Sequence, residues 1–170
     1  MDNSDPVSEL DDIQVLRTLA EVSAELNESH ESSGDRPASL AEARAALAAV
    51  IEKGPSPGIQ SEFTAPSSDN TISVGRDVLR ALLADPETAA DVRDLVAFPP
   101  GDDQMTIEQV VGDTALIAAL VTWLQLKVKF KITRSPEGTK MEVEASKEAL
   151  DSKNIGKILD LARRALGLGG

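Results

Sequence analysis

The chain contains no cysteine and only one histidine, and these two gaps exclude several kinds of chemistry. Without cysteine it can form no disulfide and no thiolate metal site. The histidine, His30, lies in a Ser- and Glu-rich stretch in which nothing apolar would hold or shield an imidazole, whereas a catalytic histidine needs a fixed geometry. Nucleophilic systems built on Ser–His or Cys–His pairs therefore have no place here. We expect no enzyme activity and no catalytic residue.

Ligand-binding motifs are also scarce. The sequence has no glycine-rich phosphate loop of the GxxxxGK[ST] type. Carboxylates occur in pairs at Asp11–Asp12, Asp102–Asp103 and Glu142/Glu144, but none of these pairs has the regular ligand spacing of a calcium loop. We interpret them as solvated helix caps and strand faces, and we expect neither a metal nor a cofactor.

Aromatic residues make up only 2% of the chain, while hydrophobic residues in total reach 41%. A packed core is therefore possible, but it must be built from Leu, Ile, Val and Ala. The length of 170 residues suits one ordinary domain with appendages. The first ten residues, MDNSDPVSEL, have neither the basic nor the apolar region of a secretory signal, so we expect a cytoplasmic protein.

Charge is unevenly distributed within the net −12. Residues 1–70 carry 14 acidic and 4 basic side chains, residues 71–126 carry 9 and 3, and residues 127–170 carry 6 and 10. Most of the chain would repel a polyanion, so we expect no nucleic-acid partner. The basic C-terminal third is expected to face an acidic protein partner, or the acidic N-terminal part of the same chain.

Two helices are predicted in the N-terminal third. Asp5 is a candidate cap for a helix over 5–28, in which apolar residues recur at helical spacing. Ser39 and Glu42 form a capping box for a second helix over 40–53. Packed on each other, these helices would make a hairpin with a thin core.

Residues 54–70 are rich in Pro, Ser and Gly, a composition typical of a linker. We therefore expect three parts: a helical N-terminal arm (1–53), a flexible linker (54–70) and a small α+β domain (71–170). The arm is expected to move independently and to dock its apolar stripe, which includes Leu16 and Leu19, into a groove of a partner.

Within the C-terminal domain, residues 71–74 and the short apolar run at 95–98 are interpreted as strands, and residues 76–84 as a helix. Thr106 and Gln109 form a capping box for a long helix ending near residue 126. Its last thirteen residues, TALIAALVTWLQL, carry no charge but rise only about 20 Å, which is less than the roughly 30 Å hydrocarbon core of a bilayer. We interpret this helix as a core helix without a transmembrane span.

The clearest pattern is a β-hairpin. Val128, Phe130 and Ile132 alternate with Lys127, Lys129 and Lys131, and a second alternating run follows at 139–145. Ser135-Pro136-Glu137-Gly138 between them has turn chemistry. An amphipathic helix is predicted at about 153–167. In this register all three lysines point outward together, either as a surface that recognises an acidic partner or as a solvated face balanced by Glu142 and Glu144.

Residues 71–170 resemble the effector-associated constant component domain of bacterial, largely actinobacterial, conflict systems. The resemblance rests on an ordered set of marks: Leu82, Asp85, Pro86, Pro99, Pro100, Gly101, Thr122, Trp123, Leu124, Pro136, Gly138 and Thr139. Two features depart from the pattern, namely the N-terminal extension of 70 residues and the Gln125 and Lys127 that stand where an arginine is expected. The resemblance implies an adaptor that accompanies variable effectors such as caspase-like or trypsin-like peptidases, and it implies no catalytic residue.

These observations favour a non-catalytic, protein-binding adaptor. The alternative is a structural subunit of a larger homo- or hetero-oligomer, in which the apolar helix packs across an interface. We expect Trp123 to be largely buried, packing that helix against Phe130 on the inner face of the hairpin, whereas exposure would make it a binding anchor.

Overall fold

The computed structural model describes residues 4–29, 35–53, 68–99, 112–144 and 153–166. A 3-10 turn, η1 (Pro6–Glu9), precedes α1 (Asp12–Ser29), α2 (Leu40–Lys53), α3 (Ser68–Ala84), α4 (Ala89–Ala97) and α5 (Gly112–Gln125). A two-stranded hairpin, β1 (Lys129–Ser135) and β2 (Gly138–Glu144), and then α7 (Lys153–Ala165) follow. The predicted α+β class with a C-terminal hairpin is confirmed.

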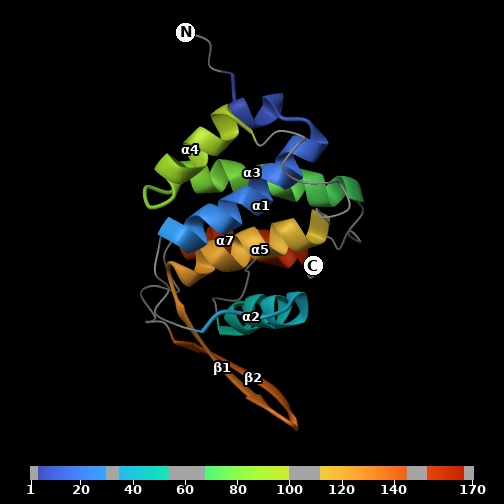
Figure 1. Cartoon of the computed structure of the whole chain (residues 1–170), viewed down its shortest axis with the longest axis vertical. Helices are drawn as coiled ribbons and strands as arrows, with labels where there is room; N and C mark the ends of the chain where they lie inside the picture. The colour runs from blue at the N-terminus through green and yellow to red at the C-terminus, as the bar shows by residue number, and fades with distance from the viewer. Residues whose placement is uncertain (1–3, 30–34, 54–67, 100–111, 145–152, 167–170) are drawn as a thin grey trace.

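The helix α5, which carries no charge beyond Asp113, lies at the centre of the molecule, with α1 and α3 on one side of it and α2 on the other (Figure 1). The α7 helix also packs against it. Eight apolar side chains of α5 are buried: Ala115, Leu116, Ile117, Ala119, Leu120, Val121, Trp123 and Leu124. The prediction of a core helix is therefore confirmed. In the described part of the chain, no helix is long and apolar enough to cross a membrane.

The N-terminal helix begins later than predicted. Asp5 caps η1, its Oδ1 accepting from Val7 N–H at 3.1 Å, and the chain then pauses before α1. A reciprocal capping box ends this pause: Asp11 N–H donates to Gln14 Oε1 at 2.9 Å, and Gln14 N–H donates to Asp11 Oδ1 at 2.8 Å. The apolar spacing runs through the break, so periodicity alone joined the two pieces.

The N-terminal helices are also placed differently from the expected arm. Val15, Leu19 and Val22 of α1 are fully buried and belong to the same hydrophobic cluster as the buried residues of α3 and α5. The α2 helix packs against α5, α7 and β2, so α1 and α2 do not form the expected two-helix hairpin. The described residues on either side of 54–67 therefore share one core.

Two expected strands are helical. Residues 71–74 belong to α3, where Val74, Val78 and Leu82 form a buried stripe with a spacing of four. Residues 95–97 complete α4, whose buried Val92 and Val96 have the same spacing. A segment of only four residues suits either structure, and it is the buried stripe over the longer segment that marks the helix.

The hairpin has the predicted register. Lys129 lies opposite Glu144, Lys131 opposite Glu142, and Phe130 opposite Val143. The turn at 135–138 closes with Gly138 at a φ of 143°, which few side-chain-bearing residues adopt. Three inner-face side chains of the hairpin are buried, as are five apolar residues of α7, which confirms the predicted last helix: Phe130, Ile132, Val143, Ile155, Ile158, Leu159, Leu161 and Ala162.

Several expectations lie outside the described residues. They are the environment of His30, most of the linker at 54–70, the loop beyond residue 99, the capping box of Thr106 and Gln109, and the Asp102–Asp103 pair.

Candidate functional site

The structure divides the predicted site residues into two groups. Lys129 and Lys131 are exposed on the outer face of β1. Trp123 is 1% exposed and Leu19 is fully buried, so both act within the core, while Leu16 is half-buried. The predicted burial of Trp123 is thus confirmed.

Lys127 does not belong to the outer face of the hairpin. It precedes β1 in a turn in which its N–H donates to Leu124 O at 2.9 Å. Its side chain is only 13% exposed, and its Nζ lies 3.1 Å from Asp85 Oδ2 and 3.0 Å from Glu87 Oε2. The strand alternation begins two residues after Lys127, so the predicted surface of three lysines is corrected to a pair.

Asp85 is the centre of a buried polar cluster that joins the α3–α4 turn to α5. Trp123 Nε1 donates to Asp85 Oδ2 at 2.7 Å, and Glu87 N–H donates to Oδ1 at 3.0 Å. Burial by itself would raise the pKa of Asp85, but the hydrogen bonds from Trp123 and Glu87 N–H, together with Lys127, hold this pKa below its ordinary value. Asp85 and Trp123 are both marks of the family resemblance, and they meet here as one structural joint.

The outer face of the hairpin carries two lysines without an acidic partner. Although Lys129 and Lys131 lie opposite Glu144 and Glu142, neither ammonium lies within 4.0 Å of a carboxylate among the described residues. Glu142 instead pairs along its own strand with Lys140, at 3.2 Å. Among the described residues, nothing acidic therefore occupies this lysine pair.

Strand β1 of the hairpin is bound to the acidic N-terminal third by hydrogen bonds and an ion pair. Arg134 Nε and Nη2 donate to the two carboxylate oxygens of Glu42 at 2.8 and 2.9 Å. Asp35 N–H donates to Phe130 O at 2.8 Å, and Asp35 Oδ2 accepts from Ile132 N–H at the same distance. Arg134, with the N–H of Ala38, lowers the pKa of Glu42 to about 2. Part of the basic C-terminal third thus faces the chain's own acidic residues, one of the two predicted possibilities.

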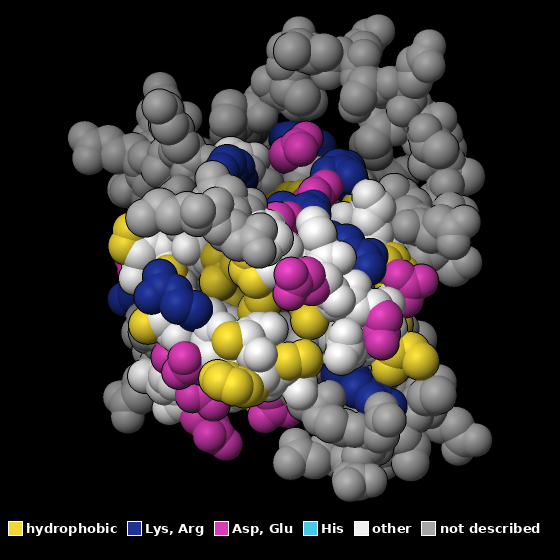
Figure 2. All heavy atoms as spheres, turned by 90° about the horizontal axis from the view of Figure 1, so that it is seen from above, with side chains coloured by type: hydrophobic (Ala, Val, Ile, Leu, Met, Phe, Trp, Pro, Cys, Tyr) yellow, Lys and Arg dark blue, Asp and Glu magenta, His cyan; other side chains and the backbone are white. Residues whose placement is uncertain are grey.

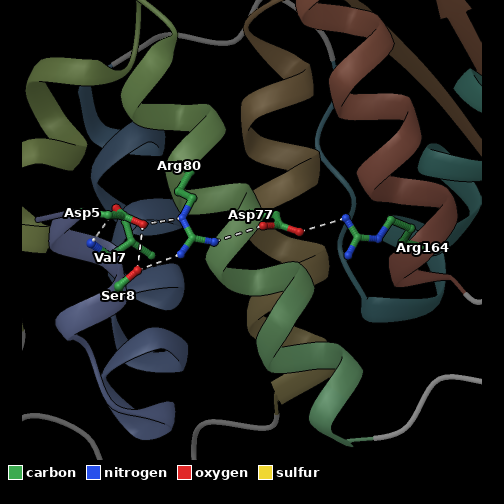
Figure 3. A network of polar contacts seen from close by, with 6 residues as sticks. All are labelled: Asp5, Val7, Ser8, Asp77, Arg80 and Arg164. Atoms are coloured by element: carbon green, nitrogen blue, oxygen red, sulfur yellow. Dashed lines mark hydrogen bonds and ion pairs between the residues drawn. The ribbon is translucent and has the colours of Figure 1, made fainter.

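A second polar network fixes the N-terminal turn. Arg80 of α3 lies between η1 and α7, with its Nε 2.6 Å from Asp5 Oδ2 and its Nη1 3.1 Å from Asp77 Oδ1 (Figure 3). Asp77 in turn accepts from Arg164 of α7 at 2.9 Å. The bond from Arg80 is the main cause that lowers the pKa of Asp5. The alternating charges hold three elements together and suggest a structural role.

Sequence reasoning missed the apolar residues exposed at the opposite end of the molecule from the hairpin. This end shows apolar side chains between acidic and basic ones (Figure 2). Phe98, which follows α4, is 82% exposed, and Ile13 in the first turn of α1 is 43% exposed. The signal for Phe98 was present in the sequence, since it is one of three Phe and directly precedes a Pro-Pro step.

The features found among the described residues are charged pairs, polar clusters and exposed apolar side chains. Among the described residues, no three His, Asp or Glu side chains gather as a metal site would require. Of the predicted acidic pairs, Asp11 caps α1, and Glu142 and Glu144 lie on β2. No protein-family model, no curated protein and no solved structure matches this chain.

Proposed function

We propose that this chain is a non-catalytic, protein-binding adaptor of the cytoplasm and that the outer face of its hairpin receives an acidic segment of the partner. The observation that carries the proposal is the pair of exposed lysines, Lys129 and Lys131, which lack an acidic partner among the described residues. Two side chains on one face of a strand lie about 7 Å apart. An acidic partner would meet both at once and would be steered toward them by charge.

The resemblance to the constant component of bacterial conflict systems supports a narrower form of the proposal. In that form the module couples a sensor or a peptidase to its effector. Asp85 and Trp123, two marks of that resemblance, have a structural use in the buried joint, so they maintain the fold that presents the hairpin. This assignment rests on the ordered marks in the sequence.

The experiment is co-purification from the native host, with partners identified by mass spectrometry, followed by association kinetics on the captured protein. The variant is Lys129→Glu/Lys131→Glu, and the matched control is Arg93→Glu/Lys157→Glu, which changes the net charge equally at exposed positions of α4 and α7. We expect the hairpin variant alone to slow association roughly tenfold or more, and the wild-type rate to fall as salt rises. A partner bound equally well by both variants and at all salt concentrations would refute the proposal.

A second candidate function, a structural subunit of a larger assembly, is favoured by a different observation. Phe98 and Ile13 expose apolar side chains, and exposed apolar surface is a common element of subunit interfaces. Light scattering on the purified chain separates the two functions, because a stable, monodisperse oligomer without a partner would favour the subunit.

A further inference from the structure

A cavity of about 320 Å³ opens between α1, α2 and α5. It is distinct from the hairpin face: its walls come from Ser23 and Asn27 of α1, from the turn that leads into α2, and from one side of α5. An apolar cavity of about 150 Å³ holds a benzene molecule, so a volume near 320 Å³ accommodates about a dozen non-hydrogen atoms.

The cavity exists because small side chains stand where large ones would be needed to fill the space. Ala43 of α2 and Ala118 of α5 form much of its apolar lining, together with Val121. At the mouth, Leu40 is 37% exposed and extends the apolar surface outward. The α1 and α2 helices both pack on α5 rather than closing over the gap between them. An apolar body of modest size would therefore fit between the three helices.

Polar groups are confined to a few positions around this apolar space. Thr122, which is buried, donates to Ala118 O at 2.7 Å, and its Oγ1 lies 3.1 Å from Ser23 Oγ. Gln125 Nε2 donates to Asp35 O at 3.2 Å, which leaves Gln125 Oε1 at the rim. A largely apolar pocket with a few oriented polar groups is typical of small-ligand sites.

Arg36 is the only charged residue among the described residues that line the cavity. Among the described residues, its guanidinium makes one long hydrogen bond, from Nη2 to Asn27 O at 3.4 Å, which leaves most of its donors without a partner there. Two acidic residues near it in the described part of the chain are already engaged: Asp35 accepts from Ile132 N–H, and Glu42 is paired with Arg134. The cavity therefore presents one available cation in a chain of net charge −12.

We propose that this cavity binds a small monocarboxylate with an apolar body, whose carboxylate meets Arg36 and whose chain lies against Ala43, Ala118 and Val121. Arginine recognises carboxylates through paired, charge-assisted hydrogen bonds. A body of about eight carbons matches the volume. The site requires no protein partner and is independent of the lysine pair on the hairpin.

The test is a titration of the full chain with sodium octanoate, followed by amide shifts in two-dimensional NMR. We expect saturable, one-to-one binding with a dissociation constant of about 1 mM, the range for a ligand of this size. The shifts should cluster at Ser23, Ala43 and Ala118, while Val92 and Gly156 should stay unchanged. 1-Octanol, which has the same body without the charge, should bind more weakly.

Three variants make the titration decisive. Ala118→Leu fills the cavity and should abolish binding while the rest of the spectrum keeps its native dispersion. Arg36→Gln should weaken octanoate about fivefold and leave octanol unaffected, whereas the control Arg93→Gln should change neither. Shifts that do not saturate, shifts that survive in a folded Ala118→Leu variant, or equal affinity for octanoate and octanol would each overturn the proposal. If Ala118→Leu fails to fold, Arg36→Gln alone decides.

Discussion

A buried carboxylate destabilises a fold unless its oxygens are paired, and Asp85 meets this condition with three donors. They are the indole N–H of Trp123, the N–H of Glu87 and the ammonium of Lys127. Trp123 therefore has two roles, one as the largest fully buried side chain and one as a hydrogen-bond donor to a buried charge. Two substitutions can separate these roles.

We predict that Trp123→Phe lowers the free energy of unfolding by about 1–3 kcal/mol, since it keeps most of the apolar volume and leaves Asp85 without one donor. Trp123→Ala should cost about 3–5 kcal/mol, because it also opens a cavity. Chemical denaturation at neutral pH measures both values.

Phe98→Ala provides the control for an aromatic residue outside the core. Since Phe98 is 82% exposed, its removal should change the free energy of unfolding by less than about 0.5 kcal/mol. If Trp123→Phe proved as neutral as Phe98→Ala, the hydrogen bond to Asp85 would contribute nothing to stability.

At the level of elements, α1 and α3 approach closely at a glycine. A Cβ added to Gly75 would lie 3.0 Å from Leu19 Cδ1 and 3.1 Å from Val15 Cγ1, both in the buried core. Gly156 of α7 is the opposite case, because a Cβ there meets nothing within 4 Å. A side chain at position 75 would therefore collide with the core, whereas a side chain at position 156 would not.

We predict that Gly156→Ala raises the free energy of unfolding by about 0.5–1 kcal/mol, the gain in helix propensity. Gly75→Ala gains the same propensity but overpacks the core at a cost of about 1–3 kcal/mol, so the net result should be a loss of up to about 2 kcal/mol. Thermal melts of the two variants check the opposite signs. A stabilised Gly75→Ala variant would show that α1 and α3 are not in close contact.

The elements that the sequence predicted well are those with a strong period. The hairpin was predicted because alternation and turn chemistry agree, and its two strands pair over 129–144 as that pattern requires. Residues 71–74 and 95–98 were misassigned because a segment of four residues is too short to show a period of its own. Lys127 was placed on the strand because alternation does not show where a strand begins, and only the buried Asp85 shows why its side chain turns inward.

The cavity and the position of α1 could not be predicted from the sequence, because both depend on how helices pack. The apolar stripe of α1 fits a partner's groove and the protein's own core equally well. The α5 helix decides between the groove and the core. Its apolar residues face several directions, so more than one other helix must cover them. A helix apolar on nearly every side therefore indicates that other amphipathic helices of the same chain cover it.

The whole molecule depends on this packing, and a deletion tests it. In the expected arrangement, removal of residues 1–53 would leave a folded domain. In the structure the deletion removes α1 and α2 and exposes the faces of α5 and α3 on which Leu19 and Val22 lie. We predict that the fragment 54–170 loses the cooperative thermal transition of the full chain. This transition should return when residues 1–53 are supplied as a separate peptide.

Point substitutions give the same prediction without truncating the chain. Leu19→Ala should lower the free energy of unfolding by about 2–5 kcal/mol, because Leu19 is fully buried where α1 meets α3. Ile13→Ala lies on the same helix but is 43% exposed, so its effect should be much smaller. Circular dichroism during heating and denaturant titration measure both variants against the fragment. Equal, small effects of Leu19→Ala and Ile13→Ala, with a fragment that melts at the temperature of the full chain, would restore α1 to the role of an independent arm.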